Sequence, residues 1–293
     1  MRTIEFTVTP EYDGKTVYTY LKGKAKISLA LLRSLKRVEN GILLAGEHTR
    51  TVDTVHTGDI ITLNIPGDEV CADKVAVTRT DIDVVYEDED ILVVNKPAFL
   101  PIHESHNHQG DTLQNVVGAY LKSRGKAASF RAVGRLDKGT SGLVVCALNR
   151  YCAARLSGNI EKEYLAIACG EYRESGTVDV PIYRPDPMKT YRTADVRGDR
   201  AVTHYSPVKT GNGMTLLRIK LETGRTHQIR VHFAHLGTPL VGDTMYGTAD
   251  ERTGRQCLHC AKVSFVHPLT GEKIVCEAPL PEDMAEITGA IHG

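Results

Sequence analysis

Apolar positions in the first 70 residues follow a period of two and then a helical period. Alternating apolar and polar residues predict a strand over 2–9. A helix is predicted to begin after Ser28, a favourable N-cap, because leucines recur behind it at helical spacing. Apolar runs beside glycine turns predict further strands at 41–46 and 58–65. The apolar positions of the predicted helix are Leu29, Leu32, Leu35 and Val38.

From residue 81 onward, strand-like and helix-like patterns are interspersed without a regular βαβ alternation. The unbroken apolar run at 143–148 predicts a buried strand, and Asp111 is expected to cap a helix that runs through Leu121. Because doubly wound folds need regular βαβ units, this order favours an α+β fold. The other predicted strands are 83–86, 91–95, 164–169, 201–208, 214–222 and 263–266, and the other helices are 150–159, 226–236 and 283–291.

Charge and composition exclude several classes of protein. The 293 residues contain 36 Lys plus Arg and 36 Asp plus Glu, and this neutral total excludes a chain that is basic throughout, such as a histone. The N-terminus lacks the apolar core of a signal peptide, and no apolar run approaches the roughly 20 residues of a membrane helix. Seven cysteines without a disulfide framework are typical of free thiols. We therefore expect a cytoplasmic protein without a membrane span.

The neutral total hides local clusters of charge. Residues 22–37 carry six cations and no acid, whereas 81–90 carry six acids. A basic stripe on a short helix can contact phosphates, but a solvated helix face has the same composition. The cations of this stripe are Lys22, Lys24, Lys26, Arg33, Lys36 and Arg37.

A glycine-punctuated loop at 134–142 places one carboxylate, Asp137, between Arg135 and Lys138. Neighbouring cations favour an ionised aspartate, which suits a catalytic carboxylate. Aspartate and glycine are also common in ordinary turns, so composition alone favours a turn.

A second polar cluster, at 222–232, combines the end of a strand, a glycine and the start of a helix. Arg225, His227 and Gln228 fall at the predicted helix N-terminus, where backbone N–H groups attract anions. Arg230 falls near the apolar side of that helix, where a cation is costly unless a carboxylate pairs with it. A solvated helix start with a snorkelling arginine is the alternative.

The remaining candidates are weak when taken one at a time. Tyr164 begins an alternating strand, where a tyrosine usually packs in the core. Dinucleotide-binding, Walker and nucleophile-elbow motifs are absent from the sequence. Cys257–Cys260 lacks a second pair of zinc ligands, and the histidines at 103, 106 and 108 lie in a polar loop without a carboxylate partner. We expect no metal site.

The order of these clusters resembles that of the RluA family of pseudouridine synthases. An Asn-Lys-Pro sequence at 95–97 follows an apolar strand and is followed by the aspartate motif at 135–142. Further matches follow in the same order at 162–164, 224–232 and 258–268. The N-terminal segment is similar, more loosely, to a degenerate S4-type RNA-binding domain, with Ala45-Gly46 where Asn-Gly is common.

This resemblance implies a fold and a division of the chain. A catalytic domain with a mixed, largely antiparallel sheet and flanking helices is expected over 82–293. An S4-like α/β domain is expected over 1–70, with a linker at 71–81. The family converts uridine in RNA to pseudouridine, so the resemblance implies an RNA partner, ribosomal more than transfer RNA. It implies no metal or nucleotide cofactor, and a monomer is expected because the RNA supplies the partner surface.

The resemblance also implies roles for individual residues. Asp137 matches the catalytic aspartate, Tyr164 the active-site tyrosine and Arg230 the active-site basic residue. Arg135 is expected to fill the stack that a flipped nucleotide leaves. The residues Arg225, His227 and Gln228 are expected to organise the pocket or contact the RNA backbone, and the basic stripe at 22–37 to bind RNA.

Two other functions stay open at this stage. A nucleoside or glycoside hydrolase could use Asp137, but it would need a second carboxylate, for which Glu163 is the nearby candidate. An RNA-binding protein that has lost catalysis is the other, although Asp137, Tyr164 and Arg230 are all present. Gly134 departs from the His or Asn that is frequent in the family, which leaves the substrate subgroup open.

Overall fold

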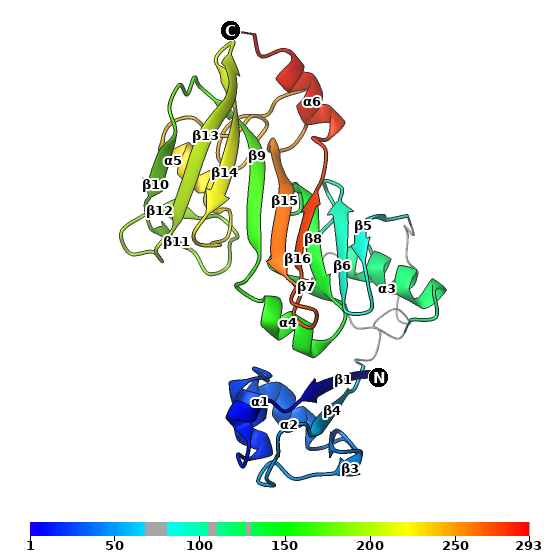
Figure 1. The fold of residues 1–293 in the computed structure, drawn as a ribbon. Coiled ribbons are helices and arrows are strands. Elements are labelled where there is room, and N and C mark those ends of the chain that lie inside the picture. The colour runs from blue at the N-terminus through cyan, green and yellow to red at the C-terminus, as the bar shows by residue number, and fades with distance from the viewer. Residues whose placement is uncertain (68–80, 105–109, 127–129, 293) are drawn as a thin grey trace.

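The N-terminal unit is a small four-stranded antiparallel sheet with two helices against it. A computed structural model describes residues 1–67, 81–104, 110–126 and 130–292. The strands follow the order β1-β4-β2-β3, and helices α1 and α2 precede β2 in the chain (Figure 1). The bounds are β1 Arg2–Thr7, α1 Val17–Gly23, α2 Leu29–Leu35, β2 Ile42–Leu44, β3 Glu47–His48 and β4 Ile60–Ile65, with a 3-10 turn at Pro10–Tyr12.

Most of the remaining described strands belong to one large sheet, in the order β10-β13-β14-β9-β15-β8-β6-β5, with β16 beside β15 and β7 beside β8. Among the described strands of this sheet, only β8 and β15 pair in parallel. The expected α+β fold on a mixed, largely antiparallel sheet is therefore confirmed. The bounds are β5 Asp83–Glu87, β6 Ile91–Lys96, β7 Arg131–Val133, β8 Ser141–Ala147, β9 Glu161–Cys169, β10 Gly176–Asp179, β13 Val202–Gly211, β14 Met214–Leu221, β15 Leu258–Val266 and β16 Lys273–Glu277.

Helices cover different parts of the large sheet. In Figure 1, α3 lies beside β5 and β6, α5 lies by β10 and β13, and α6 lies near the C-terminus. All seven residues of β8 are buried, as its unbroken apolar run predicts. The described residues contain no helix long and apolar enough to span a membrane. The bounds are α3 Leu113–Ser123, α4 Arg150–Leu156, α5 Gln228–His235 and α6 Glu282–Gly289, with a small pair of strands at β11 Ile182–Tyr183 and β12 Thr193–Ala194.

Several local predictions need correction. Thr112, not Asp111, caps α3, because its hydroxyl accepts from the Asn115 backbone in a reciprocal capping box. Ser28 does cap α2, but Leu29 is 49% exposed, since the helix turns its other leucines inward. Helix α1 was not predicted. The expected linker at 71–81 lies almost wholly outside the described residues, as do His106 and His108.

The N-terminal unit is joined to the large sheet by contacts that centre on Asp90. Arg2 donates from Nε and Nη2 to the two Asp90 carboxylate oxygens, each at 2.8 Å. Asn149 donates to the same carboxylate at 2.7 Å, and Phe6 packs edge-on against Tyr151 at 5.9 Å between ring centroids. Asp90 is buried, so this two-pronged pair constrains how the N-terminal unit sits against the sheet.

His259, on β15, makes the stability of the large sheet depend on pH. Burial lowers the pKa of His259 to about 4, against 6.5 for an ordinary histidine. Below pH 6.5 the unfolded chain takes up a proton at this site, whereas the folded chain stays neutral until about pH 4. Stability is therefore fully present above pH 6.5 and falls by about 3 kcal/mol as the pH drops through this window.

Replacing His259 with Gln should flatten that part of the pH dependence. Urea unfolding at pH 7.0, 5.5 and 4.5 measures it, and His56→Gln is the control because its side chain is 68% exposed. A wild-type pH slope in His259→Gln would contradict the assignment.

Candidate active site

Asp137 lies in the loop that joins β7 to β8, at the edge of a small cavity. The loop leaves β7 through Gly134, whose φ of +82° is one that residues with a Cβ rarely adopt. Leu136 is buried and anchors the loop, and the Thr140 N–H donates to the Asp137 carbonyl at 3.0 Å. The Asp137 carboxylate keeps 24% of its side-chain surface exposed, so a substrate can reach it.

Arg230 is the cation that faces Asp137. Its Nη1 lies 3.3 Å from Asp137 Oδ2, although 93 residues separate the two in the chain. Arg135 and Lys138 flank Asp137 in the sequence, but the closest described cation is Arg230 from α5, the residue that the family resemblance assigns to the active site. Tertiary structure thus supplies the counter-charge that the local sequence only suggested.

Asp243 completes this arrangement and was not identified from the sequence. Its two carboxylate oxygens accept from Arg230 Nε and Nη2 at 2.7 and 2.8 Å. Its side chain has no exposed surface, and the backbone N–H groups of Met245 and Tyr246 also donate to it. A buried arginine needs a carboxylate partner, which was the available clue, but an aspartate in a Gly-Asp turn gives no sign of being that partner.

The two carboxylates determine the charge state of Arg230. Burial disfavours the charged guanidinium, but the hydrogen bonds and charge of Asp243, together with the charge of Asp137, outweigh it and raise the pKa of Arg230 above its ordinary value. The side chain is also fixed in direction, because Asp243 holds two of its donors and leaves Nη1 for Asp137. Arg230 therefore presents a permanent positive charge at one place in the cavity.

His227 and Tyr246 form a second wall near the carboxylate. His227 precedes α5 with a left-handed φ of 58°, and its Nδ1 lies 2.9 Å from the Tyr246 hydroxyl. Its Nε2 lies 3.9 Å from Asp137 Oδ1. The pKa of His227 is lowered, mainly by burial. The charge of Arg230 lowers this pKa further, whereas the charge of Asp137 partly offsets the decrease. The imidazole is therefore neutral at pH 7. The ring of Tyr246, the second residue of this wall, lies 5.0 Å from the Arg230 guanidinium.

Tyr164 forms the floor of the cavity. It lies on β9, is buried, and pairs across the sheet with Cys260 on β15. Burial raises the pKa of Tyr164 well above its ordinary value, and the charge of Asp137 acts in the same direction. The phenol therefore stays protonated at neutral pH. The cavity, of about 60 Å³, is lined by Arg135, Leu136, Asp137, Thr140, Tyr164, Leu221, Arg225, His227, Gln228, Ile229, Arg230 and Leu258.

The other expected site residues differ in how far they are available to a ligand. Gln228 is buried, and its side-chain oxygen accepts a hydrogen bond from the Arg225 backbone N–H. Its side-chain nitrogen donates to the Val202 carbonyl and to the Thr203 hydroxyl. Arg225 donates to the Arg200 carbonyl at 3.1 Å. Gln228 therefore ties the turn before α5 to β13, whereas Arg135 is exposed at the cavity and available to a ligand.

Lys96, from the Asn-Lys-Pro sequence at 95–97, supports the aspartate loop from behind. Its ammonium donates to the carbonyls of Pro97 and Lys138, at 2.9 and 3.3 Å. Burial, with help from the charge of Arg255, lowers the pKa of Lys96 to about 7, although the charge of Asp137 opposes this. The motif thus connects β6 to the residue that follows Asp137.

The basic stripe divides into tethered and exposed cations. Lys22 donates to the Ile27 carbonyl at 2.9 Å, and Lys24 pairs with Glu11 at 3.1 Å. The other four, Lys26, Arg33, Lys36 and Arg37, are exposed.

The described residues bring together Asp88, Asp90 and His267, a grouping that suggests a metal site. The atoms that could bind a metal already form hydrogen bonds within the protein, however. The Asp88 carboxylate accepts two backbone N–H groups and the Tyr86 hydroxyl, and Asp90 accepts from Arg2 and Asn149. Backbone N–H groups donate to His267 Nδ1, so its proton is on Nε2, which faces Asp88 at 3.1 Å. The cluster is a hydrogen-bonded structural network.

Known proteins similar to this chain share one activity. The family model described as RNA pseudouridylate synthase matches residues 90–235. The uncharacterized RNA pseudouridine synthase YjbO of Bacillus subtilis (strain 168) is 35% identical over 271 residues, which cover 90% of this chain and 95% of that protein. Ribosomal large subunit pseudouridine synthase D of Escherichia coli O6:H1 is 38% identical over 225 residues, 70% of this chain and 69% of that protein.

A solved structure agrees with these sequence matches. Human RNA pseudouridylate synthase domain containing 1 superposes with a TM-score of 0.56 at 27% identity, over 68% of this chain and 84% of that chain. Fold, motif order and relatives define an RNA pseudouridine synthase, an isomerase that acts on uridine in RNA. Within that class, the chain belongs to the RluA family.

Replacing Asp243 with Asn tests whether this buried carboxylate holds Arg230. The change replaces one of the two Asp243 oxygens that accept from the buried Arg230 guanidinium with an NH₂ group, and it removes the negative charge. We therefore expect a loss of about 3 kcal/mol in the free energy of unfolding. Guanidinium chloride unfolding measures it. The control is Asp199→Asn, because Asp199 pairs with Arg225 at 3.4 Å but its side chain is 74% exposed; this change should stay within about 0.5 kcal/mol. Equal stabilities of the two variants would contradict the assigned role of Asp243.

Proposed function

We propose that this enzyme isomerises a uridine of large-subunit ribosomal RNA, with Asp137 as the catalytic carboxylate. The observation that carries the proposal is the 3.3 Å contact between Asp137 and the Arg230 guanidinium, at a cavity floored by Tyr164. The choice of ribosomal RNA is supported by the 38% identity to a protein named as a large-subunit ribosomal pseudouridine synthase.

The reaction rearranges bonds without adding or removing atoms from the RNA as a whole. The N1–C1′ glycosidic bond breaks, C5 of the uracil bonds to C1′, the proton at C5 is lost to solvent, and N1 gains a proton. Asp137 acts on the ribose, either at C1′ or on the C2′ proton, and both roles need an unprotonated carboxylate. Arg230 supplies the fixed counter-charge for that carboxylate.

Tyr164 and Arg135 act on the nucleotide as a whole. Tyr164 offers a ring for the uracil to pack on and a protonated hydroxyl that can donate a hydrogen bond or a proton. A uridine in a folded RNA must leave the stack to reach Asp137, and the exposed Arg135 is placed to fill the space that it leaves. The cavity of about 60 Å³ is smaller than a nucleotide pocket, so side chains at its mouth move as the base enters.

A hydrolase mechanism has less support. Glu163, its candidate second carboxylate, neighbours Tyr164 on β9 and therefore points to the opposite face of the sheet. It also pairs with Arg218 at 3.0 Å. The described cavity residues include Asp137 as their one carboxylate, which suits an isomerase better than a two-carboxylate glycosidase.

Tritium release from RNA labelled at uridine C5 tests the proposed function. The wild-type enzyme should release tritium from a large-subunit ribosomal RNA transcript, and Asp137→Asn should lower the rate by about 10³-fold or more, because the amide cannot replace an ionised carboxylate. Glu163→Gln is the control and should retain activity.

Other products would point elsewhere. Free uracil in place of pseudouridine would indicate the hydrolase. RNA binding without either product would indicate a binding protein of the same fold.

We propose further that residues 1–70 form an S4-like RNA-binding domain and 82–293 the catalytic domain. The separate N-terminal sheet and the exposed cations at the end of α2 support this division. Arg33, Lys36 and Arg37 are the cations best placed to bind RNA, because Lys22 and Lys24 are engaged within the protein.

Replacing Arg33, Lys36 and Arg37 with Gln should therefore weaken RNA binding and make it less dependent on salt. Each lost phosphate contact lowers the slope of log Kd against log salt concentration by about 1. Filter binding between 50 and 300 mM KCl measures the slope. Arg173→Gln, at an 85% exposed arginine of the catalytic domain, should leave it unchanged. A wild-type slope in the triple variant would leave the N-terminal unit without this role.

A further inference from the structure

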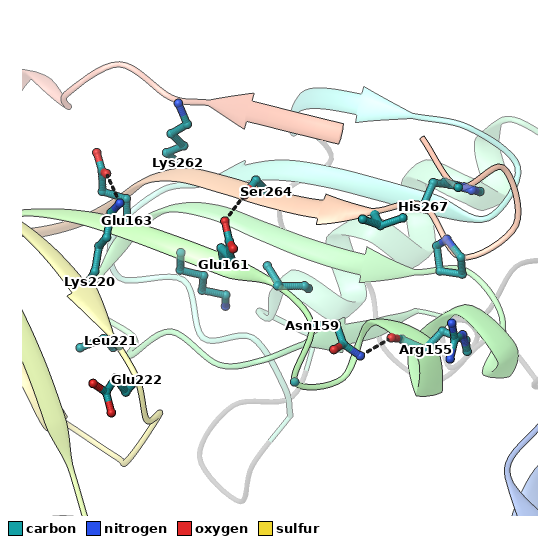
Figure 2. A pocket seen from close by; sticks show the side chains of 16 residues that line it. Arg155, Asn159, Glu161, Glu163, Lys220, Leu221, Glu222, Lys262, Ser264 and His267 are labelled. Carbon is teal, nitrogen blue, oxygen red and sulfur yellow. Dashed lines mark hydrogen bonds and ion pairs between the residues drawn. The ribbon is translucent and has the colours of Figure 1, made fainter. Parts of the chain in front are cut away.

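A large groove lies beside the cavity of Asp137. It encloses about 1000 Å³, and residues from the end of α4, the start of β9, the end of β14 and β15 line it (Figure 2). Leu221 lines both the groove and the cavity, so the two hollows adjoin. A nucleotide in the cavity is joined to flanking nucleotides, and the groove is the adjoining space that can take them.

The charges along this groove are unequally balanced. Lys262 pairs with Glu277 at 2.7 Å and Lys220 with Glu163 at 3.9 Å. Lys162 and Arg155 also line the groove, but within the described part of the chain neither has a carboxylate within 4.0 Å. Of the described acids in the lining, Glu163 and Glu222 pair with cations and Glu161 accepts from Ser264. Lys162 and Arg155 are therefore the described groove cations without a carboxylate partner.

Lys162 is the costlier of these two cations. It keeps some exposed surface, yet protein surrounds its ammonium closely enough that burial lowers the pKa of Lys162. No described residue accepts a hydrogen bond from its ammonium, whereas the fully buried Lys96 donates to two carbonyls. A cation in such surroundings is unfavourable in the free protein and gains most from an anion supplied by a ligand.

Gly134 places this cation next to the catalytic loop. A Cβ added at Gly134 would lie 2.7 Å from Lys162 Nζ, so the ammonium rests against the glycine where the loop leaves β7. Asp137 follows three residues later. Gly134 is also the position at which this sequence departs from the His or Asn frequent in the family, and the missing side chain leaves the room that the Lys162 ammonium occupies.

We propose that Lys162 binds a backbone phosphate of the substrate RNA next to the flipped uridine, and that Arg155 binds the strand further along the groove. This inference rests on the proposed function, since it assigns the groove to the RNA that carries the target uridine. The phosphate supplies the counter-charge that the described protein residues do not. It also fixes the strand relative to the loop that holds Asp137.

The test measures binding separately from chemistry. In an Asp137→Asn background, Lys162→Gln should weaken binding of a large-subunit ribosomal RNA transcript about tenfold, and should lower the slope of log Kd against log salt concentration by about 1. Lys162→Arg should keep most of the affinity. Lys262→Gln is the matched control, because Lys262 lines the same groove but pairs with Glu277. With Asp137 intact, Lys162→Gln should raise KM and keep kcat within about threefold.

Three results would overturn the proposal. A wild-type salt slope in Lys162→Gln, alongside normal tritium release, would remove Lys162 from RNA binding and leave the proposed function intact. A fall in kcat and thermal stability with unchanged Kd would make Lys162 a structural support for Gly134. Failure of the Asp137→Asn parent to bind RNA in a salt-dependent way, with no tritium release by the wild type, would overturn both this inference and the proposed function.

Discussion

The structure of the site depends on one buried cation that two carboxylates share. Arg230 is held by Asp243 through two hydrogen bonds and turns its remaining nitrogen toward Asp137. A buried guanidinium without carboxylates would be costly, and Arg230 in turn places a positive charge 3.3 Å from the Asp137 carboxylate. The two carboxylates therefore offset the free-energy cost of burying Arg230, and Arg230 offsets the cost of burying Asp243. Helix α5, the β7–β8 loop and the turn at Asp243 must all be in place for the site to exist.

The large sheet meets that requirement by bringing distant segments together. The parallel pairing of β8 with β15 and the antiparallel pairing of β15 with β9 place the Asp137 loop, Tyr164 and Cys260 side by side. The charged side chains near the site are also unevenly distributed. The chain is neutral as a whole, but most described acidic groups near the site already have partners, and two described cations without a carboxylate partner, Lys162 and Arg155, line the groove beside Asp137. A neutral protein can in this way present a locally positive path to one RNA strand.

Much of this could be predicted from periodicity and motif order, and the remainder required tertiary structure. The buried strand at 143–148 and the helix with Arg230 on its apolar side follow from apolar spacing, and the requirement of that arginine for a carboxylate follows from its burial. The family resemblance pairs this arginine with Asp137, but nothing in the sequence identifies the second partner, because Asp243 lies in a turn whose composition is ordinary. The cap of α3 was misplaced by one residue, since Asp111 and Thr112 are both good caps and only the reciprocal bond with Asn115 decides. Lys162 drew attention only as part of a motif, because a missing partner cannot be seen in a sequence.

The most direct test of this account is the single-turnover rate of tritium release by the double variant Arg230→Met, Asp243→Asn. Removing the cation together with its buried partner avoids stranding a charge, so the fold should persist. The account predicts a rate at least about 100-fold below that of the wild type, with RNA affinity within about threefold, because the lost group acts on Asp137 and not on the RNA backbone. A wild-type rate in a folded double variant would contradict it.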